Sequence, residues 1–193
     1  KQIYNDKNLL MMKIRTIHHK MFYLPVGELI IEAQAIERNL DCNKYPIEYN
    51  ELLFLIGGNL GLLFGNQELN EHYLNLSLHW ARNNNLENYE IRTIRKIVDM
   101  LAINNQHQEA LDLLGNYLDF NNLANVKTRY HIYLIGALGE IYRNLGQNAK
   151  AMECFEIVKE ASENRGIKGW VAHAYLGLAF IMFNQNKEKA KKL

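Results

Sequence analysis

The sequence predicts an all-α fold, a solenoid of about five antiparallel helical hairpins. Three observations predict it. The 193 residues include only two prolines, no stretch alternates apolar and polar residues over the length of a strand, and turn residues recur at a nearly constant spacing. These turn residues are Pro25, Gly65, Asn105, Gly146 and Asn184, at successive spacings of 40, 40, 41 and 38. Each hairpin therefore takes about 40 residues.

Polar and turn-forming residues give the expected bounds of the helices. The first helices of the hairpins are expected at residues 6–23, 46–64, 88–104, 124–145 and 168–183. The second helices are expected at residues 25–40, 67–84, 107–119, 147–164 and from 186 onward. Pro25 and Pro46 fall at helix starts, where the missing N–H of proline leaves no hydrogen bond unmade.

Glycines explain how the two helices of a hairpin come together. Gly58, Gly139 and Gly177 fall in the middle of first helices, where the absence of a side chain lets the second helix approach. Seven residues later, Gly65 and Gly146 fall where the chain must leave a helix, a position that favours a left-handed residue. We expect Asn105, at the corresponding position of the third hairpin, to adopt this conformation as well.

The best repeat resembles the tetratricopeptide family. In residues 132–164, Leu138, Gly139 and Tyr142 match the first helix of that repeat, Gly146 matches its turn, and Ala151 and Phe155 match the second helix. The match is partial in residues 52–84, 92–122 and 170–193, and residues 8–40 match by register alone. The resemblance implies a right-handed superhelix whose first helices line a concave surface.

The repeat of about 40 residues exceeds the 34 usual for that family. Long repeats of this kind are similar to those of bacterial sensor proteins, including peptide-pheromone receptors and the sensor arms of transcription regulators. From the length and composition of the chain, we expect residues 1–193 to form a single domain. Because the chain begins without a methionine and ends in what looks like the start of a helix, we also expect it to be part of a longer protein.

Composition narrows the partners and the compartment. A net charge of +1 gives no overall attraction to nucleic acid or to anionic lipid. No apolar run is long enough to cross a bilayer, and Cys42 and Cys154 stand far apart without metal-ligand spacing. We expect a soluble cytoplasmic protein that needs no cofactor. We also expect no metal site, because His18 and His19 diverge on a helix and His72 and His79 lack accompanying ligands.

No pattern for catalysis is present. Gly57 and Gly58 lie inside a predicted helix rather than between a strand and a helix, which argues against a phosphate-binding loop. Ser77 and Ser162 have no neighbouring general base and no nucleophile-elbow pattern. The sequence therefore predicts a binding protein and not an enzyme.

The register of the best repeat predicts which side chains face a ligand on the concave surface. Asparagine can bond both the N–H and the C=O groups of an extended peptide, and arginine can hold a carboxylate in a bidentate pair. The first hairpin could add Arg15, His19 and Phe22. The predicted partner-binding residues are Asn59, Leu62, Arg92, Arg95, Asp99, Tyr133, Glu140 and Arg143.

The alternative to partner binding is a purely structural role for these residues. Arg92, Arg95, Lys96 and Asp99 could form a solvated helix face with intrahelical ion pairs worth a few tenths of a kcal/mol each. Asn59 could simply fill a polar position beside a glycine. Leu55 stands where a carboxylate clamp of the chaperone-binding type would need a cation, which argues against such a clamp.

Three functions can be weighed against these features of the sequence. The first is a scaffold that binds a protein or peptide, in the sensory or regulatory region of a larger bacterial protein. The second is a self-associating structural or dimerisation module of a transcription regulator, whose open solenoid ends pair with another copy to give a homodimer. The third, direct DNA binding, is disfavoured because this chain has a balanced charge and no helix-turn-helix pattern.

Overall fold

The computed structural model describes residues 7–126 and 128–190, and all regular secondary structure in these ranges is helical. The all-α prediction is confirmed. The chain forms two compact units, the first ending at Ile97 and the second beginning at Val98, so that the boundary falls within one helix.

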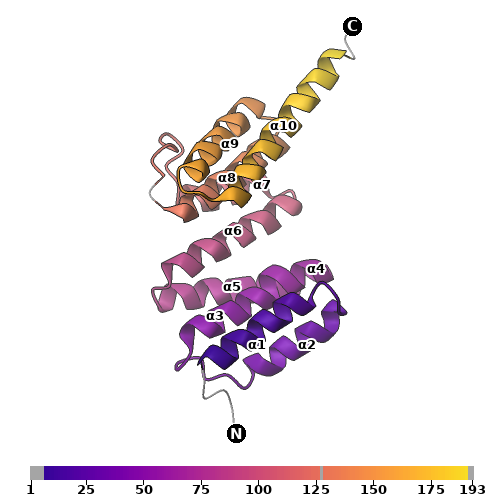
Figure 1. Cartoon of the computed structure of the whole chain (residues 1–193), viewed down its shortest axis with the longest axis vertical. Coiled ribbons are helices and arrows are strands. Elements are labelled where there is room, and N and C mark those ends of the chain that lie inside the picture. Colours follow the sequence, from indigo (N-terminus) through magenta and orange to yellow (C-terminus); the bar gives the residue numbers. More distant parts are fainter. Residues whose placement is uncertain (1–6, 127, 191–193) are drawn as a thin grey trace. The chain divides into compact units, whose positions relative to one another are not determined.

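The first unit is built from helices joined by turns and short loops (Figure 1). Its core is aliphatic, because Leu10, Leu29, Leu52 and Ile56 are at most 1% exposed. Here α1, α2, α3 and η1 pack on one another, and α5 packs on α3 and η1. The elements are α1 (Lys7–Lys20), α2 (Val26–Glu37), α3 (Pro46–Phe54), η1 (Leu55–Gly61), α4 (Leu62–Phe64), α5 (Gln67–Asn83) and α6 (Glu87–Ile103), the last of which continues past the boundary.

The segment η1 is a π-helix, which the sequence did not predict. A single α-helix was expected over residues 46–64, whereas the chain widens into a π-helical stretch between α3 and α4. π-helical turns are rare and are often found at functional sites. The expected close approach of the second helix is made by Gly57 rather than by Gly58. A Cβ atom at Gly57 would lie 2.9 Å from the backbone nitrogen of Leu74 in α5, whereas the nearest atoms to one at Gly58 would be 3.4 Å away.

Three of the predicted turn residues adopt the left-handed conformation. The φ angle is +70° at Gly65, +60° at Asn105 and +71° at Gly146. Gly65 follows α4 directly, and its N–H bonds back to the carbonyl of Leu62. The prediction that these residues end helices is confirmed.

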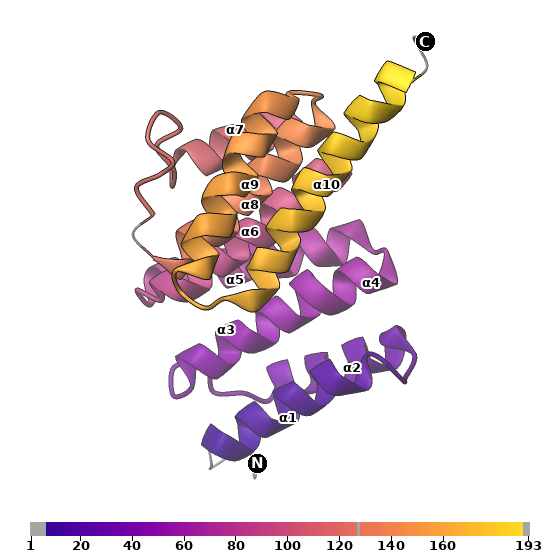
Figure 2. The same cartoon turned by 45° about the horizontal axis from the view of Figure 1, so that its top comes forward.

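The second unit centres on α8, which packs against α7, α9 and α10. Figure 2 shows α9 and α10 lying side by side. Gly139 and Gly177 make room for Phe155 of α9, since a Cβ atom would lie 3.1 Å and 2.6 Å from its ring at these two positions. The elements that follow α6 are α7 (His107–Gly115), α8 (Arg129–Asn144), α9 (Asn148–Glu163) and α10 (Lys168–Ala190).

Three predicted boundaries in this unit are wrong. The helix expected over residues 107–119 ends earlier, at Gly115. The expected turn at Asn184 is absent, because α10 continues from Lys168 to Ala190. Asparagine costs an α-helix well under 1 kcal/mol, so this residue does not stop the helix. The predicted helix over residues 124–145 begins later, at Arg129, because the Thr128 hydroxyl caps it by accepting a hydrogen bond from the N–H of Tyr130.

The close approach at Gly57 gives a stability prediction. We expect Gly57→Ala to lower the free energy of unfolding by about 1–3 kcal/mol, because the new methyl group collides with the backbone of α5. Gly27→Ala is the matched control within the same unit, because a Cβ atom there meets only Phe64 at an ordinary 3.6 Å. The control is expected to be neutral or stabilising by up to about 1 kcal/mol. Urea unfolding measures both, and equal stabilities would contradict the packing at Gly57.

Candidate functional site

The first unit contains a recess of about 220 Å³ whose wall comes from α1, α3, η1 and α6. Its floor is apolar and its other lining residues are polar or charged. Recesses that combine an apolar surface with a few convergent polar groups are the usual form of a ligand site. The lining residues are Met11, Ile14, Arg15, His18, Glu51, Phe54, Leu55, Asn59 and Arg92.

Arg92 of α6 is held in place from several sides. Its Nη1 and Nη2 atoms donate to the two carboxylate oxygens of Glu51 in α3, at 3.0 and 2.8 Å. The guanidinium carbon also lies 4.0 Å from the ring centre of Phe54 and 5.0 Å from that of Tyr89, which adds cation–π attraction. Arg92 therefore presents a fixed positive charge at the wall of the recess.

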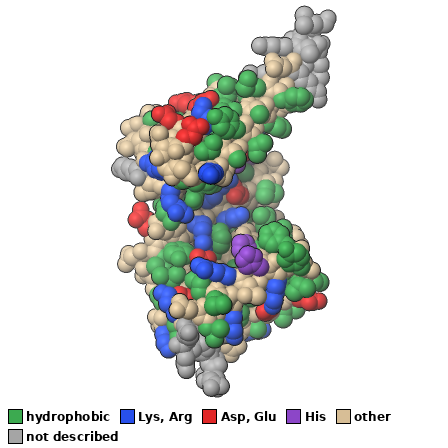
Figure 3. Space-filling view, in the orientation of Figure 1, with side chains coloured by type: hydrophobic (Ala, Val, Ile, Leu, Met, Phe, Trp, Pro, Cys, Tyr) green, Lys and Arg blue, Asp and Glu red, His purple; other side chains and the backbone are tan. Residues whose placement is uncertain are grey.

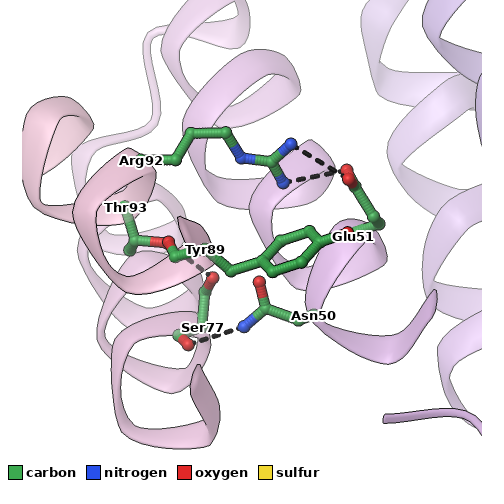
Figure 4. A network of polar contacts seen from close by, with 6 residues as sticks. All are labelled: Asn50, Glu51, Ser77, Tyr89, Arg92 and Thr93. Carbon is green, nitrogen blue, oxygen red and sulfur yellow. Dashed lines mark hydrogen bonds and ion pairs between the residues drawn. The ribbon is translucent and has the colours of Figure 1, made fainter. Parts of the chain in front are cut away.

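Buried hydrogen bonds fix the same stretch of α6 against α3 and α5 (Figure 4). The hydroxyl of Thr93 donates to the carbonyl of Tyr89 at 2.8 Å and lies 3.0 Å from the hydroxyl of Ser77. Since Thr93 has one proton, Ser77 is the donor in the second contact. The Nδ2 atom of Asn50 donates to the carbonyl of Ser77 at 2.8 Å. All three polar side chains are fully buried.

Polar groups of the recess have hydrogen-bond donors with no partner among the described residues. Within residues 7–126 and 128–190, neither the Arg15 guanidinium nor the Asn59 amide forms a hydrogen bond or an ion pair. The Nε atom of Arg92 is buried and likewise lacks an acceptor. Figure 3 shows histidine side chains beside Lys and Arg side chains on the face turned to the viewer. The recess thus offers donors and positive charge that the chain itself does not fully use.

The structure brings only part of the predicted set to this recess. Asn59 and Arg92 line it together, whereas Leu62 is exposed on α4 and does not. Arg95 shares α6 with Arg92 but is not a lining residue, and Asp99 belongs to the second unit.

The first hairpin contributes one of its three proposed residues, Arg15. The histidine at the recess is His18, not the expected His19, and Phe22 is 72% exposed and outside the lining. The intrahelical alternative does not describe Arg92, because its ion pair reaches across to Glu51 in another helix.

In the second unit, Tyr133, Glu140 and Arg143 lie on the side of α8 that faces α10. Tyr133 stacks on Trp170 with 4.7 Å between ring centres. Glu140 forms an ion pair with Arg143 and lies 3.4 Å from the Nε2 atom of His173. The guanidinium carbon of Arg143 lies 4.7 Å from the ring centre of Phe180, so all three predicted residues contact α10 within the second unit.

Other polar groups serve packing. Burial and the neighbouring carboxylate of Glu37 raise the pKa of Tyr49 to about 12. The Tyr49 ring meets Trp80 edge to face, and the indole of Trp80 donates to the carbonyl of Pro46 at 2.9 Å. A second recess, of about 120 Å³, lies beside the connection from α7 to α8, and none of the predicted residues lines it.

The described residues contain neither a cluster of metal ligands nor a membrane-spanning helix. No group of three or more His, Cys, Asp or Glu side chains is arranged to hold a metal ion. No helix in the described part of the chain has the length and apolar character needed to cross a membrane.

Sequence reasoning missed Glu51 and His18. Glu51 lies near the end of α3 and has no basic residue at helical spacing, so no local pattern connects it to Arg92. A signal for His18 was available, since it stands one turn after Arg15 on the same helix and shares its face.

Comparisons with protein-family models, with curated proteins and with solved structures gave no match. The function must therefore be argued from the chain's own geometry.

The pair of Arg92 and Glu51 gives a second prediction. Arg92→Met and Glu51→Gln, made singly and together, are expected to show a coupling of about 1 kcal/mol in the free energy of unfolding, because the pair is bidentate and about three-quarters buried. The more exposed pair of Lys20 and Glu32 is the control. Its coupling, from Lys20→Met and Glu32→Gln, is expected below about 0.5 kcal/mol. Additive effects of the first two substitutions would show that Arg92 and Glu51 do not interact in solution.

Proposed function

We propose that this chain is a peptide- or protein-binding module of the tetratricopeptide-like kind, and that its ligand docks in the recess of the first unit. The observation that carries the proposal is the convergence of Asn59 and Arg92 in one recess. The repeat register predicts that both contact a ligand, and they come from separate helices, η1 and α6. Arg15 joins them there.

The lining suits a peptide better than a small polar metabolite. Ile14, Phe54 and Leu55 are at most 8% exposed and give an apolar floor for one side chain of a ligand. The Asn59 amide has both a donor and an acceptor, which matches the two groups of a peptide backbone. Extended peptides are recognised in this way by grooves that combine main-chain hydrogen bonds with side-chain pockets.

A peptide-display experiment tests this role. Random dodecapeptides selected on the wild-type chain are expected to lose at least about tenfold in affinity for Met11→Trp, because the indole fills the recess. Met12→Trp is the matched control, since Met12 is the next residue along α1, is 64% exposed and does not line the recess. Fluorescence anisotropy gives the affinities. Selected peptides that bind both variants equally would place the ligand elsewhere, and no selected peptides would contradict a peptide-binding role.

The second candidate function is self-association through α10. In the repeat register, Leu176 and Phe180 correspond to Leu138 and Tyr142 of α8. The α8 residues are 0% and 9% exposed beneath α9, whereas Leu176 and Phe180 are 72% and 51% exposed. Together with Phe183, also exposed, they form an apolar stripe at helical spacing that a second copy could cover.

Light scattering during size exclusion tests this second candidate. If α10 pairs with another copy, wild type elutes as a dimer, and Leu176→Lys combined with Phe183→Lys yields monomers, because charges in an apolar interface oppose burial. Met12→Lys combined with Phe22→Lys, at exposed apolar positions of the first unit, is expected to leave the dimer intact. A monomeric wild type would rule out this function.

A further inference from the structure

We propose that the recess of the first unit selects an acidic side chain of its peptide ligand, held by Arg15 and Asn59, and that Glu51 sets the strength of this binding from within the protein. The inference rests on the proposed function and specifies the chemistry of the ligand. Three observations lead to it.

The first observation is the balance of charge. Two arginines, Arg15 and Arg92, line the recess against one carboxylate, that of Glu51. Because Glu51 pairs with Arg92, the excess positive charge is that of Arg15, an exposed residue at the edge of the apolar lining. An acidic group is therefore the complement that the recess lacks.

The second observation is the set of unused donors. Arg15 on α1 and Asn59 on η1 come from different elements, and neither has a partner among the described residues. A carboxylate with two oxygens can accept from a guanidinium and an amide at the same time, and bonds of this charge-assisted kind are stronger than neutral ones. Both donors are available without breaking a contact of the folded chain.

The third observation is the position of Glu51. Its carboxylate occupies Arg92 in a bidentate pair and also lines the recess. A ligand carboxylate therefore enters the field of a protein carboxylate, which weakens the attraction of the two arginines. We expect removal of the Glu51 charge to increase affinity for an acidic ligand, an effect that a purely structural role of Glu51 would not produce.

Two synthetic peptide libraries test the inference. Both consist of dodecamers with blocked termini and uncharged residues at the variable positions, one with a central Leu-Glu and the other with a central Leu-Gln. The immobilised wild-type chain is expected to retain the Glu library at least fivefold better. Arg15→Met should abolish this preference. Arg38→Met should preserve it, since Arg38 is also exposed in the first unit but lies outside the recess.

The affinity of a retained Glu peptide then tests the role of Glu51. Glu51→Gln is expected to raise this affinity about fivefold, consistent with removal of one nearby charge in a partly screened site. Glu32→Gln makes the same change in net charge away from the recess and is expected to have no effect. A fall in affinity in Glu51→Gln would overturn the assigned role of Glu51.

The outcomes separate this inference from the proposed function. Equal retention of the two libraries by wild type, with retention lost in Met11→Trp, would overturn the selection of an acidic group and leave the peptide site standing. Retention of neither library would contradict both proposals.

Discussion

The close approach of η1 to α5 is the constraint on which the candidate site depends. Gly57 and Gly61 both face α5, where a Cβ atom would lie within 3.3 Å of its backbone. These glycines stand four residues apart, about one helical turn. Asn59, midway between them, therefore points to the opposite side, toward the recess. The glycines bring two helices together, and the same geometry turns the one polar side chain of η1 toward α1 and α6.

The recess also depends on how α6 is fixed. Arg92 is positioned by its neighbour Thr93, whose hydroxyl lies 3.0 Å from that of Ser77 in α5. The carbonyl of Ser77 in turn accepts a hydrogen bond from Asn50 of α3. Burying these polar side chains would cost free energy if they lacked partners, so the network favours one register of α6 against its neighbours. The ion pair between Arg92 and Glu51 lies next to this network, because Arg92 precedes Thr93 on α6 and Glu51 follows Asn50 on α3.

Sequence reasoning succeeded at positions where a single backbone requirement decides which residue can stand there. Gly65, Asn105 and Gly146 end helices because a left-handed residue is needed there, and each was found from its spacing. Asn184 shows the limit of that argument, since asparagine also fits inside a helix. The π-helical form of η1 could not be predicted, because a stretch of seven residues is too short for its apolar spacing to distinguish a π-helix from an α-helix.

The site was predictable in part for a related reason. Asn59 and Arg92 were found because the repeat register is local and regular. Glu51 was not found, because its partner is 41 residues away in sequence and their pairing depends on how α6 packs. Arg15 was named from the register of the first hairpin, but the same register pointed to His19 where the structure has His18.

The most direct test of the recess as a ligand site is a nitrogen-correlated NMR titration of the wild-type chain with a peptide retained from the Glu library. If the peptide binds in the recess, the side-chain signals of Asn59 and the Nε–H of Arg92 shift on binding. The indole signal of Trp80, whose hydrogen bond to Pro46 lies outside the recess, should stay unchanged. Shifts confined to the second unit, with the Asn59 and Arg92 signals unmoved, would show that the peptide does not bind in the recess.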